Sequence, residues 1–190
     1  MPIFFRKNAM TLTELIIASV LMGIMMVGLV SVDLAVRSSR ATATADTAVA
    51  IQTQAAMLRI TNDAMKAVGN SSNPGVSSAA GFLCFRHDTD NDPNTFSGDT
   101  WVCYDKDGND IDRCTPPVPE HCTLSSIGYE SVLLGKTSDF TYNFFLDSTT
   151  KKLYVDISMT NRFDTTVAAH PITNPDYTIS THVSPPGHGY

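Results

Sequence analysis

The sequence is short of positive charge and lacks the short motifs that are typical of enzymes. Its 13 lysines and arginines are outnumbered by 19 aspartates and glutamates, which gives a formal net charge of −6. Because a nucleic-acid-binding surface must neutralise phosphates, this balance argues against DNA or RNA as a partner. The sequence also contains no G-x-S-x-G, P-loop, H-E-x-x-H or dinucleotide-binding glycine pattern. We therefore expect neither an enzyme nor a nucleic-acid-binding protein.

Charge is absent altogether from residues 15–32, which form a continuous apolar run between Glu14 and Asp33. A helix of this length reaches the lower end of what is needed to cross a bilayer. Arg6 and Lys7 precede the run, and basic residues favour the cytoplasmic side of a membrane. The sequence therefore predicts one transmembrane helix with its N-terminus inside and the rest of the chain exported.

The residues before the apolar run do not follow the order of a secretory signal. Such a signal carries its small-residue cleavage site after the apolar core. Here the small residue Ala9 comes before the core, in the segment RKNAMTLTEL, and Glu14 stands directly in front of the run. A carboxylate at the edge of a membrane helix is costly unless it is paired or hydrated, so Glu14 is a candidate functional residue.

This order resembles the N-terminal motif of type IV prepilins and of type II secretion pseudopilins. In that motif a basic leader and a small residue precede a hydrophobic residue, T-L-x-E-L and an apolar stretch, and residues 7–15 fill these places. The resemblance implies cleavage by a prepilin peptidase between Ala9 and Met10, followed by N-methylation of Met10. It also implies that Glu14 pairs with a terminal amine during assembly. The family usually has glycine where Ala9 stands and often phenylalanine where Met10 stands.

The helix is expected to continue well beyond the membrane. Residues 29–68 contain neither glycine nor proline, and Gly69 with Asn70 forms a natural stop. Apolar residues recur here at spacings of three, four or seven, namely Ala48, Ile51, Ala55, Leu58, Met65 and Val68. Such a stripe is typical of a helix face that packs against a core, which we favour over a face that binds a partner.

Beyond residue 70, short apolar segments separated by turn residues predict β-strands. The expected strands are residues 81–85, 100–104, 127–134, 140–146, 152–159 and 177–183. The clearest hairpin joins the fourth and fifth of these segments, whose apolar residues alternate. We expect an antiparallel sheet laid on the distal half of the helix. This late hairpin loosely resembles the heads of minor pilins of the PilW type and of J-type pseudopilins.

The resulting organisation is an α+β chain of pilin-like type with three parts. Residues 1–9 form the leader, and residues 10–69 form a long helix whose transmembrane part covers about residues 15–32. Residues 70–190 form a globular, β-rich head outside the inner membrane.

The head contains all four cysteines, which are Cys84, Cys103, Cys114 and Cys122. An oxidising compartment favours disulfides, and four cysteines allow three connectivities. We favour Cys84 with Cys103, which would join neighbouring strands, and Cys114 with Cys122, which would close a proline-rich loop. Zinc is the alternative, but no C-x-x-C occurs and the nearby histidines lie at no familiar ligand spacing.

Two acidic segments, residues 88–92 and 105–112, place oxygen ligands at alternate positions, as a calcium site requires. We favour the second segment, with Asp105, Asp107, Asn109 and Asp112 as the candidate ligands. The twelfth place of an EF-hand loop would fall on Pro116, so the segment is no standard EF-hand. The alternative is a solvated turn, and no cofactor other than calcium is expected.

These expectations describe a minor pilin or pseudopilin, a structural subunit of a type IV pilus or type II secretion pseudopilus. Its partners would be other pilin subunits, through the N-terminal helix, together with the prepilin peptidase and the inner membrane. One alternative is a signal-anchored periplasmic module that binds calcium or another ligand and never enters a filament. A membrane-anchored hydrolase is the second alternative, although the sequence nominates no catalytic cluster.

Overall fold

The structure is a computed structural model that describes residues 11–70, 72–79, 82–90, 92, 95–147, 149–150, 152–171 and 174–186. The chain divides into two compact units, Met1–Thr44 and Ala45–Tyr190. Helix α1 (Leu12–Met65) contributes residues to both units. The expected leader and its cleavage pair, Ala9 and Met10, lie outside the described residues.

Helix α1 begins with a reciprocal pair of hydrogen bonds between Thr11 and Glu14. The backbone N–H of Thr11 donates to the Glu14 carboxylate at 2.8 Å, and the Glu14 N–H donates to the Thr11 hydroxyl at 3.3 Å. This arrangement is a capping box, which satisfies N–H groups that the first helical turn leaves unpaired. The helix is long and apolar enough to cross a membrane, and its most apolar segment is exposed in the structure. The predicted apolar N-terminal helix is therefore confirmed.

In the second unit, α1 buries a different face from the predicted one. Its buried residues are Val49, Thr53, Ala56, Met57, Ile60, Asp63 and Ala64. Two members of the predicted stripe, Ile51 and Leu58, are 60% and 61% exposed, so the prediction that this stripe faces the core was wrong. Both faces of the helix carry apolar residues, and the face that packs also includes polar side chains with partners on the sheets.

The helix ends at Met65, before the predicted end at Gly69, because the chain then pairs with a strand. Ala67 forms a β-bridge with His87, and the Val68 N–H donates to the carbonyl of Arg86 at 2.9 Å. The backbone next passes very close to itself. A Cβ added to Gly69 would lie 2.3 Å from the backbone nitrogen of Gly75, so no side chain fits at this position.

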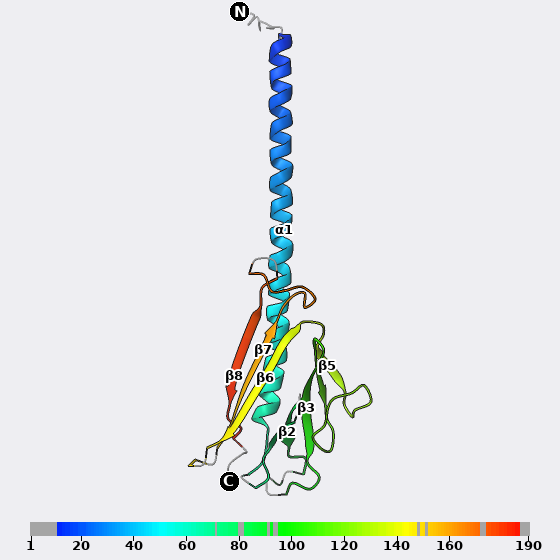
Figure 1. The fold of residues 1–190 in the computed structure, drawn as a ribbon, viewed down its shortest axis with the longest axis vertical. Coiled ribbons are helices and arrows are strands. Elements are labelled where there is room, and N and C mark those ends of the chain that lie inside the picture. The colour runs from blue at the N-terminus through cyan, green and yellow to red at the C-terminus, as the bar shows by residue number, and fades with distance from the viewer. Residues whose placement is uncertain are drawn as a thin grey trace, which may run out of the picture. The chain divides into compact units, whose positions relative to one another are not determined.

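Five antiparallel strands follow in chain order and form the first sheet (Figure 1). They are β1 (Val76–Ala79), β2 (Phe82–His87), β3 (Thr100–Asp107), β4 (Asp110–Cys114) and β5 (Glu130–Leu133). Strands β1 and β4 were not predicted. The first lies in a serine-rich stretch before the first expected strand, and the second overlaps the acidic segment 105–112 that we favoured for calcium.

The second sheet contains β6 (Thr137–Leu146), β7 (Leu153–Asn161) and β8 (Tyr177–Val183), again antiparallel. The predicted hairpin is confirmed, with Leu146 opposite Leu153 at its closed end. We expected one sheet on the helix, and the described strands form two. Strands β1 to β5 are hydrogen-bonded into one sheet, and β6 to β8 form a separate sheet.

One hydrophobic core joins the helix to both sheets. It includes Ile60 of α1, Leu83 and Tyr104 of the first sheet, and Val155 and Ile157 of the second. Strands of both sheets run beside the distal part of α1 (Figure 1). The α+β class, with a long N-terminal helix and antiparallel sheets, is therefore confirmed.

A smaller cluster covers the opposite face of the first sheet and contains Phe82 and all four cysteines. Strand β2 is consequently buried on both faces from Phe82 to Arg86. The cysteines thus stabilise a part of the head that the helix does not reach.

Two alanine substitutions test which face of α1 packs on the sheets. Ile60 is fully buried, so Ile60→Ala is expected to lower the free energy of unfolding by about 2–5 kcal/mol. Leu58→Ala removes an exposed side chain and is expected to change it by less than about 0.5 kcal/mol. Chemical unfolding of the full chain in detergent micelles, followed by the fluorescence of Trp101, measures both. Equal losses would show that the helix is rotated relative to this structure.

Candidate functional site

The first unit presents an apolar helix surface with one carboxylate at its start. The Glu14 carboxylate also accepts a hydrogen bond from the Thr11 hydroxyl at 2.9 Å, so within one chain it serves to cap α1. Apolar side chains after it are exposed, as at Val27, which is 72% exposed. A Cβ added to Gly23 or Gly28 would meet nothing within 4 Å, so another helix has room to approach closely there.

The second unit has its own exposed apolar helix face, which we call the outer stripe. It consists of Ala48, Ile51, Ala55, Leu58 and Met65, all exposed. Their spacing alternates between three and four residues, with Asn62 in the remaining place, and this is the a/d pattern of helices that pack side by side. What we expected to be a core-facing stripe is thus a surface available to a partner.

A groove of about 340 Å³ extends the outer stripe onto the first sheet. It is lined by Gln52 and Ala55 of α1, by residues 131–134 of β5 and its end, and by Lys136. Leu134 in this groove is 65% exposed. The exposed apolar surface of the head therefore includes both helix and sheet.

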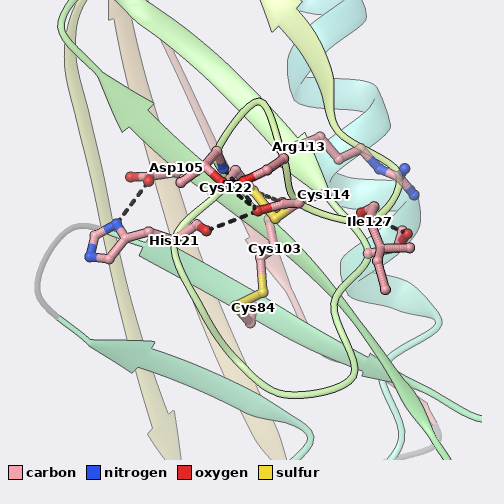
Figure 2. The surroundings of a disulfide bond; sticks show 12 residues. Cys84, Cys103, Asp105, Arg113, Cys114, His121, Cys122 and Ile127 are labelled. Atoms are coloured by element: carbon pink, nitrogen blue, oxygen red, sulfur yellow. Dashed lines mark hydrogen bonds and ion pairs between the residues drawn. A yellow bond between two sulfur atoms is a disulfide. The ribbon is translucent and has the colours of Figure 1, made fainter.

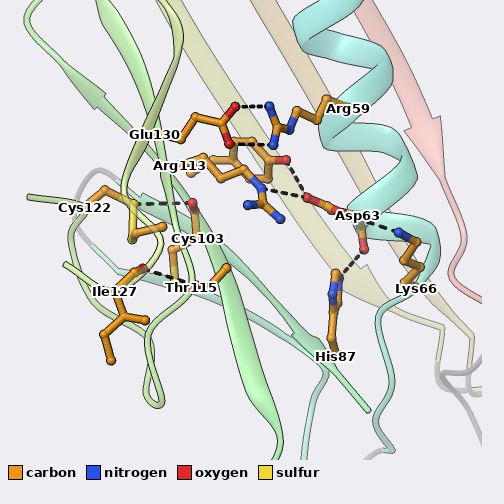
Figure 3. Close-up of polar contacts among 12 residues, drawn as sticks. Arg59, Asp63, Lys66, His87, Cys103, Arg113, Thr115, Cys122, Ile127 and Glu130 are labelled. Atoms are coloured by element: carbon orange, nitrogen blue, oxygen red, sulfur yellow. Dashed lines mark hydrogen bonds and ion pairs between the residues drawn. A yellow bond between two sulfur atoms is a disulfide. The ribbon is translucent and has the colours of Figure 1, made fainter. Parts of the chain in front are cut away.

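On its buried side, α1 is held to the first sheet by the carboxylate of Asp63 (Figure 3). Its Oδ2 accepts hydrogen bonds from the Tyr104 hydroxyl at 2.7 Å and from Nε of Arg113 at 3.0 Å. The backbone carbonyl of Asp63 also accepts a hydrogen bond from Nε2 of His87 at 2.9 Å. One helical residue is therefore bound to three strands.

One turn earlier on the helix, Arg59 forms a two-pronged ion pair with Glu130 at the start of β5 (Figure 3). Its Nη2 lies 2.6 Å from Oε2 of that carboxylate. The hydrogen bond from Arg59 holds the pKa of Glu130 below its ordinary value. Because both side chains are about 40% exposed, this pair contributes less to stability than the buried Asp63 contacts.

Burial fixes the protonation states around Asp63. It raises the pKa of the Tyr104 hydroxyl, and the neighbouring charge of Asp63 raises it further. Burial also lowers the pKa of His87. At neutral pH both groups are therefore neutral hydrogen-bond donors. Since Asp63 and Tyr104 are almost completely buried, we assign them to holding the helix rather than to chemistry on a substrate.

The predicted disulfide pairing is confirmed (Figure 2). Cys84 and Cys103 lie directly opposite each other on β2 and β3 and are bonded, with their Cα atoms 4.0 Å apart. Cys114, at the end of β4, is bonded to Cys122. The second disulfide closes the proline-containing loop against the face of the sheet that α1 does not cover. Both disulfides suit an oxidising compartment.

The predicted calcium ligands Asp105, Asp107, Asn109 and Asp112 lie on and beside the tight turn of the β3–β4 hairpin. Strand β3 continues to Asp107, which pairs with Asp110 at the start of β4. Gly108 turns the chain with a φ of 57°, a left-handed conformation that glycine adopts without strain. The expected turn lies at Gly108 and Asn109, and the acidic residues on either side of it lie on two paired strands.

Several of these groups already have partners. The Asp105 carboxylate lies 2.8 Å from Nδ1 of His121 (Figure 2), and the carbonyl of Asn109 accepts a hydrogen bond from Thr137 at 2.9 Å. The carboxylates of Asp105, Asp107 and Asp112 form no close group of three among the residues that the structure describes. Calcium at these positions stays a prediction.

The structure instead brings together Asp88, Asp90 and Asp99, whose carboxylate oxygens lie within 4.8 Å of one another. The sequence indicated the acidic segment 88–92, but we did not predict Asp99 as a candidate ligand. Its position in the sequence could have indicated this role. Asp99 is the twelfth residue counted from Asp88, and the twelfth residue of an EF-hand loop is its last ligand.

A groove of about 510 Å³ on the second sheet bears on the hydrolase alternative. Nδ1 of His182 lies 2.6 Å from the Asp156 carboxylate there, as in the base and orienting acid of a serine hydrolase. Among the described residues, however, no serine or threonine hydroxyl is hydrogen-bonded to His182. Asp156 and His182 alone do not form an activated nucleophile.

Comparisons with protein-family models, curated proteins and solved structures find no match for this chain. Its function is therefore inferred from its own residues: the N-terminal motif, the exposed apolar faces of α1 and the carboxylates of the head.

Removing the Asp63 carboxylate tests the attachment of the helix to the first sheet. Asp63→Ala leaves Arg113 without its ion pair and Tyr104 without an acceptor, so we expect the free energy of unfolding to fall by about 3 kcal/mol. Asn62→Ala, at the exposed preceding residue, is the matched control and should change it by less than about 0.5 kcal/mol. Urea unfolding of both variants at neutral pH compares them. A similar small effect of both substitutions would contradict the role given to Asp63.

Proposed function

We propose that this chain is a minor pilin or pseudopilin, a structural subunit that enters a filament through its N-terminal helix. One observation carries the proposal. The prepilin-like motif of residues 7–15 leads directly into a helix that presents exposed apolar residues in both units of the chain. Cleavage between Ala9 and Met10 would leave that helix at the new N-terminus.

The exposed apolar surface supports this role physically. Large apolar patches on a protein surface mark contacts with a membrane or with other proteins. Before assembly, a bilayer would cover the apolar segment of residues 15–32. Entry into a filament would replace lipid contacts with helix contacts, for which Gly23 and Gly28 leave room. The outer stripe would then meet neighbouring subunits through its regular spacing.

The position of Glu14 supports a role in setting the register of assembly. Removal of residues 1–9 would create a charged amine at Met10, and a carboxylate attracts such a group strongly where water is excluded. An unpaired charge in that environment is costly, so only the register that pairs amine and carboxylate is favoured. The capping box would hold the Glu14 carboxylate at the helix start until a neighbour's amine reaches it.

The head fits an exported subunit. Both disulfides are favoured in an oxidising compartment such as the periplasm, which agrees with the topology expected from Arg6 and Lys7. The second candidate function is a signal-anchored periplasmic module that binds calcium or another ligand, which the grouped carboxylates of the head favour. Such a module would keep residues 1–9 and remain in the membrane fraction.

Two substitutions of Glu14 separate its capping role from its assembly role. Glutamine at the third helical position can still accept the capping hydrogen bonds, so Glu14→Gln keeps the helix start and removes only the charge. We expect Glu14→Gln and Glu14→Ala to insert normally into the membrane and to be incorporated into sheared filaments at least about tenfold less than the wild type. Immunoblots of membrane and filament fractions measure both quantities.

Thr11→Ala, which weakens the cap but leaves the charge of Glu14, is the control and should still be incorporated. Normal incorporation of Glu14→Gln would contradict the proposed pairing of charges. Loss of incorporation in Thr11→Ala alone would mean that only the cap matters.

A further inference from the structure

The pairing of β2 with β3 brings carboxylates together in the loop that joins these two strands. The last paired residues of the two strands are His87 and Thr100, directly opposite each other. Asp88 and Asp99, the next residue on each side, must therefore leave the sheet side by side. Asp90 follows closely, and the carboxylate oxygens of the three residues lie within 4.8 Å of one another.

Hydrogen bonds within the loop fix the orientation of these carboxylates. Asp88 accepts a hydrogen bond from the N–H of Asp90 at 3.1 Å, and Asp99 accepts one from the N–H of Thr89 at 3.3 Å. The hydroxyl of Thr95 donates to Asp90 at 2.8 Å. All these donors are neutral, so they position the carboxylates without balancing their charge.

Asp99 is the member of the group that has a buried oxygen without a hydrogen-bond donor. Its side chain is only 1% exposed, and its Oδ2 is buried without a hydrogen-bond donor. The nearest cationic atom is Nε of Arg86 at 3.9 Å, which is beyond hydrogen-bond distance. A buried carboxylate oxygen without a donor is costly and calls for a partner.

Arg86 cannot supply that partner fully, because its guanidinium is engaged elsewhere. Its Nε points to the carbonyl of Val68 at 3.3 Å, and its Nη2 donates to the carbonyl of Asn73. The group also lies over the ring of Phe96, 4.0 Å from the ring centre. Three carboxylates and one guanidinium give −3 + 1 = −2, which is the charge that a divalent cation balances.

We propose that Asp88, Asp90 and Asp99 form a binding site for a divalent cation of the calcium type. Calcium is held by carboxylate oxygens in flexible geometry, whereas magnesium demands a near-ideal octahedron and structural zinc prefers nitrogen and sulfur. The three residues occupy the first, third and twelfth places of a loop, which are ligand positions in an EF-hand. The bound ion would fix the loop against β2 and β3.

This site lies apart from the helix faces used in the proposed function, so either proposal can fail without the other. It differs from the segment favoured in the sequence analysis, where the twelfth place is Pro116. Asp112 in that segment also has a buried oxygen, Oδ1, without a hydrogen-bond partner, as Asp99 has in Oδ2. Only Asp99, however, belongs to a close group of three carboxylates among the described residues.

The test is a titration of the full chain in detergent micelles with calcium chloride after treatment with a chelator. We expect isothermal titration calorimetry to show one site with a dissociation constant of about 10⁻⁴ to 10⁻³ M or tighter, and weaker binding of magnesium. Terbium is a second probe. Its luminescence should be sensitised by Trp101, whose ring lies 5.5 Å from the guanidinium carbon of Arg86, and calcium should displace it.

Asp99→Asn is expected to weaken calcium binding by at least about tenfold, because it removes one of the three ligand charges. Asp107→Asn, in the exposed turn of the β3–β4 hairpin, is the matched control and should leave the affinity within about twofold. Circular dichroism establishes that each variant is folded. If Asp99→Asn does not fold, Asp88→Asn replaces it with the same expected loss.

Three results would overturn the proposal. The first is the absence of calcium binding at concentrations of about 10 mM, well above the weakest sites of extracellular modules. The second is unchanged affinity in a folded Asp99→Asn or Asp88→Asn variant. The third is loss of binding in Asp107→Asn alone, which would place the ion at the β3–β4 hairpin.

Discussion

The packing of one face of α1 against both sheets is the contact on which the rest of the head depends. Two polar contacts fix the rotation of the helix. The Asp63 carboxylate is bound by Tyr104 and Arg113 of the first sheet, and the buried hydroxyl of Thr53 accepts a hydrogen bond from Asn161 of the second sheet at 2.7 Å. Because breaking either contact would leave buried polar groups unpaired, rotation of the helix about its axis is strongly disfavoured.

That rotation determines which apolar residues remain for partners. With Ile60 inside, the residues of the outer stripe must face outward, and Leu58 stays largely exposed. A helix that served only the head would not need apolar residues at these places, and a contiguous exposed apolar patch is typical of a surface that contacts a partner or a membrane. The first unit shows the same property more strongly in residues 15–32. An unassembled subunit with such a helix needs a membrane, and an assembled one needs neighbouring helices, which is the basis of the proposed function.

Local patterns in the sequence predicted the features that depend on neighbouring residues. Alternation in β6 and β7 predicted their hairpin, and the apolar run predicted the start of α1. The position of the cysteines on neighbouring expected strands and at the ends of a proline-rich loop predicted both disulfides. The buried face of the helix was not predictable in this way, since Met57 and Leu58 are equally apolar and only contacts with distant strands distinguish them. Strand β4 was missed because its acidic residues resemble a loop, although pairing with β3 and β5 decides its structure. Asp99 was missed because the exact register of β2 with β3, which places it beside Asp88, is set by strand pairing, and its twelfth position in the loop was the one signal that we overlooked.

In the proposed function, one face of α1 holds the head together, and the other apolar faces of the helix contact a membrane or neighbouring subunits. We propose that cleavage makes this helix the N-terminus of a filament subunit. Intact mass measurement with N-terminal peptide mapping, on protein purified from its native membrane, tests this most directly. We expect a chain that lacks residues 1–9 and begins at a methylated Met10. A chain that retains residues 1–9 would contradict it and would leave the signal-anchored module as the better description.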